Sequence, residues 1–560
     1  MAMAIAPVAA VAASAPGVVT FPVPASAGVT FSDSAGNGGV YALAPLADGS
    51  VVAAGLGQAS ASGGGTSKNS PAVARLLPDG RLDPAFGSSG VALPGPPALC
   101  DAFPVQVLVD PSRRVLILGD YGNGRWSLCR LLASGSVDAS FCGCSGQQGA
   151  VDLSGELSLK GAPSVSLLAN GSILIGGQSS VDGRMLVARL TAGGLLDPSF
   201  GSGGVVTVSG PSSQTTGSLL ATLPDGRFFD AIGASLLRLT AAGAPDPAFA
   251  GGAPVALAQP PAALLAQADG SVLVLGGSRV TKYTAAGALD ASYGSGGSVA
   301  TPNTADTLPN TRAFAAMLAA PDGSTVVAGP APGSAAAAVI ERLDQHGTAD
   351  PAFGGTTGRT VPLPFGGGTY GADALAGKLV NLNHTGVPVP PPFAVAIRPD
   401  GSLVIGTGVD VVGVPNDGAI DVSFVEHWGL VAFAPSAALD TGFGAPSTLR
   451  VRLSLPQRRV RRVFSRSGRC AALATTGCIE VRFRPSATGL ANVRVKARGQ
   501  LVAQGALGLF TTASDTEPIP LTAAGRRLLR RGGRVTLTAL LRAKDLAGNT
   551  AASQARAKLS

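Results

Sequence analysis

The sequence predicts an all-β protein, a seven-bladed β-propeller followed by a small second β-domain, and three observations lead to this prediction. First, the 560 residues include 78 Gly and 42 Pro but only 13% charged residues, and the glycines recur between short apolar stretches. That arrangement is typical of turns in a folded β protein. Second, one short motif recurs seven times. Third, the chain becomes strongly basic after residue 447. Repeats of this kind decide the fold before domains are counted from length.

The recurring motif is an apolar strand followed by Asp-x-x-Phe or Asp-x-x-Tyr. Its seven copies are Asp83 and Phe86, Asp138 and Phe141, Asp197 and Phe200, Asp246 and Phe249, Asp290 and Tyr293, Asp350 and Phe353, and Asp440 and Phe443. Successive Asp residues are 55, 59, 49, 44, 60 and 90 positions apart, so the last copy is stretched. In such a turn the Asp accepts hydrogen bonds from nearby backbone N–H groups, and a following Gly takes the left-handed conformation. We expect the aromatic ring to pack as a wedge between neighbouring sheets.

An upstream hairpin signal accompanies the motif. Asp-Gly pairs such as 225–226 and 400–401 precede apolar strands, and Asp-Gly supports the positive φ angles of a tight hairpin. Four antiparallel strands in roughly 50 residues suit a propeller blade, whereas a stack of sandwiches needs roughly 100 residues per unit. Residues 29–31 (Val-Thr-Phe) precede the first copy without a hairpin of their own, and we expect them to complete the last blade.

Two copies carry a family resemblance. The segments ARLLPDGRLDPAFGSSGV (74–91) and VARLTAGGLLDPSFGSGGV (187–205) resemble the delta-60 repeat of secreted and surface bacterial proteins. The resemblance covers roughly residues 28–447, which we assign to the propeller. Copies two and seven depart from the pattern, with Cys142 in place of the turn Gly and Thr441 in place of Pro. The resemblance implies a propeller but no activity, because that family has no shared catalytic residues.

Residues 1–27 have the composition of an export signal. The stretch from Met1 to Val19 is apolar and uncharged, and residues 13–15 and 25–27 are both small-x-small cleavage candidates. Pro16 disfavours the first, so cleavage is expected after Ala27. The segment lacks Lys and Arg, which leaves a disordered lead as the alternative. No later stretch reaches the roughly 18 consecutive apolar residues of a membrane helix. The prediction is a secreted or cell-surface protein.

Six cysteines fit an oxidising compartment. Cys470 and Cys478 are close in sequence and are expected to form a disulfide. The other four, Cys100, Cys129, Cys142 and Cys144, cluster in one repeat and allow three pairings. A metal site at 142–144 is the alternative, but its spacing lacks the two intervening residues of usual zinc knuckles and no His lies nearby. Disulfides are therefore favoured.

The region 448–560 differs from the rest in charge. It holds 22 Lys plus Arg and 4 Asp plus Glu, a net charge of +18, which leaves 19 basic and 29 acidic residues, a net of −10, before it. Alternating stretches at 479–483 and 493–496 predict half-buried strands. The region resembles the small immunoglobulin-like sandwiches that end many secreted actinobacterial proteins. Its charge favours either attachment to anionic cell-wall polymer or lipid head groups, or a plain solvated face. No aromatic interleaving indicates nucleic acid.

Catalytic and cofactor motifs are scarce. There are three histidines, and H-E-x-x-H, G-x-S-x-G and C-x-x-C do not occur. Residues 366–371 fit G-x-G-x-x-G, but without the strand and helix that a nucleotide site requires. The Asp residues belong mostly to turns, and no D-x-D-x-D calcium loop occurs. We therefore expect no cofactor and no metal.

Blade topology separates two faces. The turns after the first and third strands fall on one face, and the loops between the second and third strands and between blades fall on the other. Function usually resides in loops on a rigid scaffold, so we expect it on the second, variable-loop face. The seventh repeat is the longest, with extra material at Thr369–Pro392 and Thr407–His427. Its candidate ligand-binding residues are Tyr370, Asp373, His384, Asp410, Asp417, His427 and Trp428. For Trp428 a core position, and for His427 an ordinary surface position, are the alternatives.

Together these features predict a monomeric, non-enzymatic binding or scaffold propeller. It would recognise a polysaccharide or a protein through the variable-loop face, with the ligand left open. The alternative is a propeller enzyme of the glycosidase or lyase type, with Asp and His residues at the channel mouth.

Overall fold

The computed structural model describes residues 12–15, 18–22, 39–59, 68–94, 100, 102–122, 124–142, 149–208, 217–301, 316–330, 337–353, 358–362, 393–413, 423–440, 442–443, 450–464, 477–485, 489–509, 515–545 and 550–560. Their strands form seven sheets before residue 440 and two after residue 450. Helical segments are few: α1 (Leu153–Leu157), α2 (Ala523–Arg530) and the short 3-10 turns Ala250–Gly252, Pro351–Phe353 and Val460–Phe464. The prediction of an all-β chain is confirmed.

Six of the seven sheets consist of four strands that are antiparallel and neighbours in sequence. The first contains β3 (Gly39–Pro45), β4 (Val51–Ala59), β5 (Lys68–Leu76) and β6 (Val91–Ala92). The second contains β7 (Phe103–Val109), β8 (Val115–Gly122), β9 (Arg125–Leu131) and β10 (Ala150–Asp152). The third contains β11 (Leu159–Leu167), β12 (Ile173–Ser179), β13 (Met185–Leu190) and β14 (Val205–Val208).

The fourth to sixth sheets repeat the plan. The fourth contains β15 (Ser218–Thr222), β16 (Phe228–Ile232), β17 (Ser235–Leu239) and β18 (Val255–Ala256). The fifth contains β19 (Ala263–Ala266), β20 (Val272–Gly276), β21 (Arg279–Tyr283) and β22 (Ser298–Ala300). The sixth contains β23 (Ala316–Ala319), β24 (Thr325–Pro330), β25 (Ala337–Leu343) and β26 (Arg359–Pro362).

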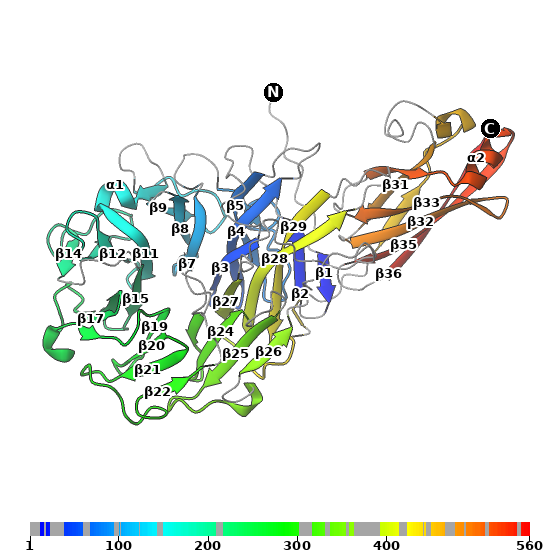
Figure 1. The fold of residues 1–560 in the computed structure, drawn as a ribbon. Coiled ribbons are helices and arrows are strands. Elements are labelled where there is room, and N and C mark those ends of the chain that lie inside the picture. The colour runs from blue at the N-terminus through cyan, green and yellow to red at the C-terminus, as the bar shows by residue number, and fades with distance from the viewer. Residues whose placement is uncertain are drawn as a thin grey trace.

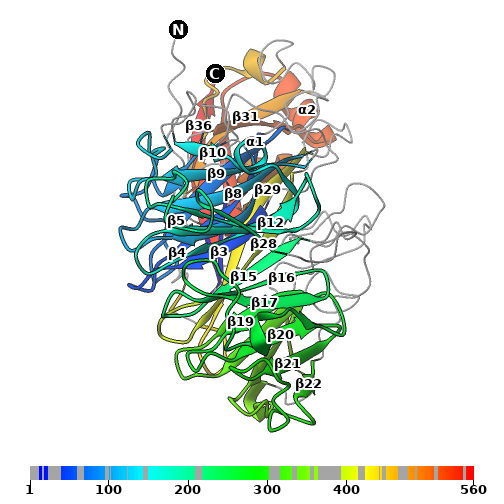
Figure 2. The same cartoon turned by 90° about the vertical axis from the view of Figure 1, so that its left-hand side faces the viewer.

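The sheets pack face to face in chain order. The first strand of each sheet contacts the first strand of the next, and β27 of the seventh sheet contacts β3 of the first. A separate hydrophobic cluster lies between each successive pair, including one shared by the seventh and first sheets. Figures 1 and 2 show the sheets succeeding one another around the body. This arrangement is that of a β-propeller.

The seventh sheet draws on both ends of this region. It contains β27 (Phe393–Ile397), β28 (Leu403–Gly413), β29 (Ser423–Phe433), β2 (Val18–Pro22) and β1 (Ala12–Ala15). β2 pairs antiparallel with β29, from Val18 opposite Val431 to Pro22 opposite His427. The place beside β29 that we expected residues 29–31 to fill is thus taken by β2, and residues 29–31 lie outside the described part of the chain. The expected leader contributes two strands to this sheet.

The seven motif aromatics are wedges, as predicted. Each is buried to 2% exposure or less. The residue directly after the aromatic has a positive φ in the five copies where the structure describes it: 55° at Gly87, 66° at Cys142, 54° at Gly201, 50° at Ala250 and 56° at Gly294. Glycine tolerates this left-handed conformation, whereas a residue with a Cβ is strained by it. The fourth turn therefore carries strain at Ala250.

Replacing Ala250 with Gly should stabilise the propeller by about 0.5–1 kcal/mol, because relief of the left-handed strain exceeds the added chain entropy of glycine. Ala248→Gly in the same turn is the matched control, since the described residues with positive φ do not include Ala248. The free energy of unfolding of both variants is measured by urea unfolding, with tryptophan fluorescence as the signal. A midpoint lowered equally by the two substitutions would contradict the strain at Ala250.

The C-terminal region forms two sheets around a core of its own. One contains β30 (Val451–Ser454), β31 (Cys478–Pro485) and β34 (Asp515–Pro520), and the other contains β33 (Gln500–Leu509), β32 (Gly489–Ala497), β35 (Val535–Asp545) and β36 (Thr550–Leu559). A single hydrophobic cluster is built from both sheets and from Leu529 of α2. These strands lie to one side of the seven sheets, beside β28 and β29 (Figure 1).

Disulfides are present in both regions. Cys100 is bonded to Cys129 within the second sheet. Cys142 and Cys478 are also disulfide-bonded, and the described part of the chain has no free cysteine. Bonding of Cys142 excludes a metal–thiolate site at this residue. Cys144 and Cys470 lie outside the described residues, so the Cys470–Cys478 pairing stays a prediction. None of the helices in the described ranges has the length and apolar character needed to cross a membrane.

Candidate functional site

We call the face that carries the turns after the first and third strands the turn face. A side-chain unit recurs on this face, and we call it the clamp. It consists of the Arg or Lys eight residues before the motif Asp, the Asp itself, and the aromatic wedge. In the third sheet, Arg189 Nε lies 2.8 Å from an Asp197 oxygen, and its guanidinium carbon lies 4.7 Å above the centre of the Phe200 ring. The other clamps with an Asp ion pair are Arg75–Asp83–Phe86, Arg130–Asp138–Phe141, Arg238–Asp246–Phe249 and Lys282–Asp290–Tyr293. Each clamp fixes its turn against the third strand.

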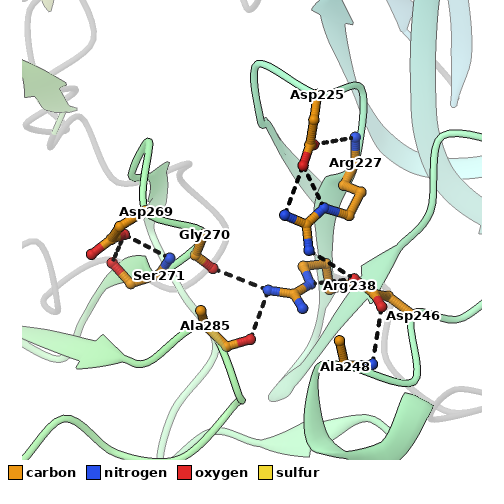
Figure 3. Close-up of polar contacts among 9 residues, drawn as sticks. All are labelled: Asp225, Arg227, Arg238, Asp246, Ala248, Asp269, Gly270, Ser271 and Ala285. Atoms are coloured by element: carbon orange, nitrogen blue, oxygen red, sulfur yellow. Dashed lines mark hydrogen bonds and ion pairs between the residues drawn. The ribbon is translucent and has the colours of Figure 1, made fainter.

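The clamp also reaches the next sheet. Arg75 donates to the Ala133 carbonyl at 2.7 Å, and Arg189 donates to the Ala241 carbonyl at 2.6 Å. Figure 3 shows Arg238 held by Asp246 and donating to the Gly270 and Ala285 carbonyls of the fifth sheet, at 3.1 and 2.8 Å. Charge-assisted hydrogen bonds of this kind are stronger than neutral ones. The Arg of each of these clamps therefore joins its sheet to the next one, whereas Lys282 of the fifth sheet pairs within its own repeat, with Asp290.

In the seventh sheet the clamp is rebuilt from another strand. The equivalent position holds Ala432, and Arg398 at the end of β27 takes over the role. Its guanidinium lies 2.6 Å from Asp440 and over the Phe443 ring, and it donates to the Pro78 carbonyl of the first sheet at 2.8 Å. Arg398 therefore links the last sheet to the first.

The carboxylates of the turn face are engaged in this framework. The Asp138 pKa stays below its ordinary value despite burial, because Ser140 and the Arg130 charge stabilise the anion. The Ser199 and Ser292 hydroxyls lower the pKa of Asp197 and Asp290 in the same way. A group ionised at neutral pH and held in an ion pair is unsuited to donate a proton as a general acid. These three motif carboxylates therefore stabilise their turns as ionised partners of Arg or Lys.

A cavity of about 410 Å³ opens on the turn face between the sixth, seventh and first sheets. It is lined by Pro45, Leu46, Ala47, Ala319, Ala320, Pro321, Ile397, Arg398 and Pro399. Nearly all of this lining is apolar, and Arg398 is already bonded to Asp440, Ser402 and Pro78. Within the described ranges, no group of three or more His, Cys, Asp or Glu residues could hold a metal ion. The cavity offers no acid–base pair for catalysis.

The variable-loop face is described best where the second and third sheets meet. The short helix α1 lies there, and its N-cap Asp152 accepts from the Ser154 and Gly155 N–H groups. The backbone N–H of Trp126 in β9 donates to Ser154 Oγ at 2.7 Å, and Ser154 Oγ donates to the Gly124 carbonyl of the β8–β9 loop at 3.2 Å. The backbone N–H of Ser180 donates to the Ser158 carbonyl at 2.7 Å. These bonds join two loops and the crossover between the sheets into one surface.

That surface exposes a mixed set of side chains, which we call the α1 patch: Arg125, Glu156, Val181, Asp182 and Arg184. Val181 is 84% exposed at the tip of its loop. The loop is held from inside, because the buried Gln178 donates to the Gly183 carbonyl at 2.9 Å. Val181 thus stands at the tip of this loop, with the exposed Asp182 and Arg184 close to it in the sequence.

The predicted ligand residues of the seventh repeat are only partly placed. Asp410 and His427 lie at adjacent positions of the β28–β29 ladder, where Asp410 pairs with Glu426 and His427 with Val409. Trp428 is a core residue, 1% exposed, and its indole N–H donates to the Leu56 carbonyl at 2.7 Å. The others, Tyr370, Asp373, His384 and Asp417, lie outside the described residues.

Two acids that the sequence analysis did not single out are buried in the sheets. Burial raises the pKa of Asp230 to about 7, although the Ser218 hydroxyl donates to it at 2.7 Å. Burial likewise raises the pKa of Glu341 to about 7, and neither carboxyl oxygen has a hydrogen-bond partner among the described residues. Asp230 lies in β16 of the fourth sheet and Glu341 in β25 of the sixth sheet, so the two acids belong to sheets that are not neighbours.

Glu341 should make the stability of the propeller fall as the pH rises. Its pKa is about 7 when folded and near the ordinary 4.5 when unfolded, so the folded chain holds a proton that the unfolded chain releases between these values. Glu341→Gln should therefore gain stability relative to the wild type from pH 4.5 to 8, by up to about 3 kcal/mol. Urea unfolding across this range measures it, with the exposed Glu156→Gln as control. A pH-independent difference would contradict a buried, titrating Glu341.

The clamp cation was also missed, although a signal existed. An Arg or Lys precedes the motif Asp by eight residues in six of the seven copies, at 75, 130, 189, 238, 282 and 342. Arg342 differs from the others because its ion-pair partner is Asp322. Like the other Arg residues, it stacks on its aromatic wedge, Phe353, and it donates to a carbonyl of the next sheet, that of Pro435. The fixed spacing identifies the clamp from the sequence alone.

One family model matches three stretches of the repeated region. The family described as "Domain of unknown function (DUF5122) beta-propeller" matches residues 46–86, 111–141 and 168–200, stretches that end at the wedges of the first three sheets. No curated protein matches the sequence significantly. The family match and the sheet arrangement establish a β-propeller.

Solved structures that resemble the chain do so distantly. The polysaccharide lyase Uly1 is 11% identical, with a TM-score of 0.33 over 70% of this chain and 89% of its own. The gluconolactonase XC5397 from Xanthomonas campestris is 13% identical, with a TM-score of 0.27 over 58% and 93%. The aldose sugar dehydrogenase from Streptomyces coelicolor is 12% identical, with a TM-score of 0.27 over 74% and 99%. Likenesses this weak carry no argument about function.

Proposed function

We propose that the chain is a secreted or cell-surface binding propeller without catalytic activity, which recognises a polysaccharide or a protein through its variable-loop face. The observation that carries this proposal is the use of the turn-face carboxylates. Asp83, Asp138, Asp197, Asp246 and Asp440 each pair with an Arg that also bonds to the next sheet. These five acids are engaged in holding the sheets together, which disfavours their use as the catalytic acids of a glycosidase or lyase.

We further propose that the propeller has seven blades of the delta-60 type. The seven sheets, the contact of β27 with β3 and the cluster shared by the seventh and first sheets support this number. The recurrent clamp supports a common repeat. For the C-terminal region, two sheets around one core support an immunoglobulin-like sandwich.

Export is supported by the bonded cysteines Cys100, Cys129, Cys142 and Cys478, because disulfides persist mainly in oxidising compartments. Cleavage after Ala27 would remove β1 and β2, so an exported chain that keeps its seventh sheet complete retains residues 12–22. N-terminal sequencing of the exported protein distinguishes the two forms.

The location of the binding site is tested in two steps. Binding of the full chain to a glycan and peptidoglycan array identifies a ligand, and the affinity of variants with a substitution on either face is then measured for that ligand. Val181→Asp places a charge on the α1 patch and should weaken binding at least tenfold. Leu195→Asp is the matched control, because Leu195 is a 53% exposed apolar residue in a turn on the opposite face. It should leave binding unchanged. If Leu195→Asp weakens binding and Val181→Asp does not, the site is on the turn face and the proposal is wrong.

A further inference from the structure

Exposed cations occupy the outer side of the sheet β33–β32–β35–β36. Residues alternate along its strands, so that Val493, Val495, Leu537 and Leu541 enter the core and their neighbours face solvent. The exposed basic residues on this outer face are Arg494, Lys496, Arg542, Arg556 and Lys558. We name them the basic sheet face.

Strand register places these five cations among neutral neighbours. Arg494 lies opposite Leu540 and Gln504, Lys496 lies opposite Thr538, and Arg542 lies opposite Asn492. On the edge strand, Arg556 lies opposite Thr538 and Lys558 opposite Thr536. None of the five makes an ion pair with any other residue that the structure describes. The surface therefore carries uncompensated positive charge.

This pattern differs from that of the clamps in the propeller, where Arg side chains form ion pairs within the protein. Arg75, Arg130, Arg189 and Arg238 are each paired with an Asp. Lys and Arg on an edge strand also prevent sheets from joining edge to edge, which accounts for Arg556 and Lys558. It does not account for Arg494 and Lys496, because β32 lies between β33 and β35. Cations on a central strand require another reason.

The side chains of the basic sheet face favour one class of anionic partner over a membrane or a nucleic acid. Insertion into a membrane needs large apolar groups, and the exposed large apolar residue on this face is Leu540, 37% exposed. Single-stranded nucleic acid binds through aromatic stacking, and the described outward residues include no aromatic. Asn492, Gln504, Gln554 and Thr536 instead place amide and hydroxyl groups beside the cations. Such groups bind sugar hydroxyls.

We infer that the basic sheet face binds a linear chain of sugar or polyol units with one carboxylate or phosphate per repeating unit. Cations on one strand recur roughly every 6.8 Å, and neighbouring strands lie roughly 4.8 Å apart. Successive charges of an extended polymer can therefore be contacted together. This inference is independent of the ligand of the propeller, since it concerns a different region of the chain.

Binding of the full chain to immobilised polygalacturonate tests the inference, with poly(glycerol phosphate) as the phosphate arm and dextran as the neutral control. The variant Arg494→Gln/Lys496→Gln/Arg556→Gln should weaken binding at least tenfold and reduce its dependence on salt, as expected when fewer counterions are released. The matched control Arg81→Gln/Arg113→Gln/Arg279→Gln makes the same change in net charge at exposed propeller positions. It should weaken binding less than threefold.

Binding to either anionic polymer, but not to dextran, supports the inference and tells carboxylate from phosphate preference. If both triple variants lose the same amount of binding affinity, binding responds to net charge alone and the inference is overturned. Tighter binding to phosphatidylglycerol vesicles or to a single-stranded DNA oligonucleotide than to both polymers would overturn it as well. Thermal unfolding of each variant shows whether the fold is retained.

Discussion

Arg238→Ala should destabilise the propeller by about 3–5 kcal/mol, the cost expected when one partner of a buried ion pair is removed. Arg238 is 1% exposed and pairs with Asp246 at 2.7 Å. The substitution leaves the Asp246 carboxylate with less compensation, and it removes the donors to Gly270 and Ala285 (Figure 3). Urea unfolding of the full chain, followed by near-ultraviolet circular dichroism, measures the change in the propeller transition.

Arg81→Ala is the control for this prediction. Arg81 pairs with Asp79 at the same distance of 2.7 Å, but its side chain is 73% exposed. An exposed pair contributes about 0–1 kcal/mol, so this variant should unfold almost like the wild type. Equal effects of the two substitutions would show that the clamp is no more than a surface ion pair.

Trp428→Ala should also cost about 3–5 kcal/mol, because it opens a cavity in a packed core. The indole lies in the cluster shared by the seventh and first sheets, and it bonds to Leu56 across that boundary. Its loss weakens the contact that joins the end of the propeller to its beginning. Limited proteolysis should therefore accelerate together with the fall in the urea midpoint.

Trp428→Phe separates packing from hydrogen bonding. It keeps most of the ring volume but leaves the buried Leu56 carbonyl without its donor, which should cost about 1–3 kcal/mol. A loss below about 1 kcal/mol for Trp428→Ala would be typical of a surface residue and would contradict its place in the core.

The sequence predicts the local features of this fold well. Asp-x-x-Phe turns and Asp-Gly hairpins depend on neighbouring residues, so the positions of Asp197 and Phe200 follow from spacing alone. The hydrogen bonds that the clamp makes to the next sheet are different, because they join distant residues such as Arg189 and Ala241, 52 positions apart. A reading confined to single repeats could not relate these two residues.

The closing strand shows a second limit. Residues 18–22 and 29–31 are both short apolar stretches, and the composition of the first resembles an export signal. The antiparallel pairing of β2 with β29 joins residues as far apart in the chain as Thr20 and Gly429, 409 positions apart. Nothing local distinguishes the strand that pairs. Glu341 was missed for a related reason, since a single acid in an apolar strand carries no signal of whether it faces solvent or a neighbouring sheet.

The most direct test of the account is the fate of a glycan that the protein binds. The full chain is incubated with each oligosaccharide that it retains on the array, and the products are analysed by mass spectrometry. A binding propeller whose turn-face acids are held in clamps should release every oligosaccharide with its mass unchanged. Shortened or unsaturated products, made by the wild type and abolished by substitution of an acid on either face, would contradict the account and establish an enzyme.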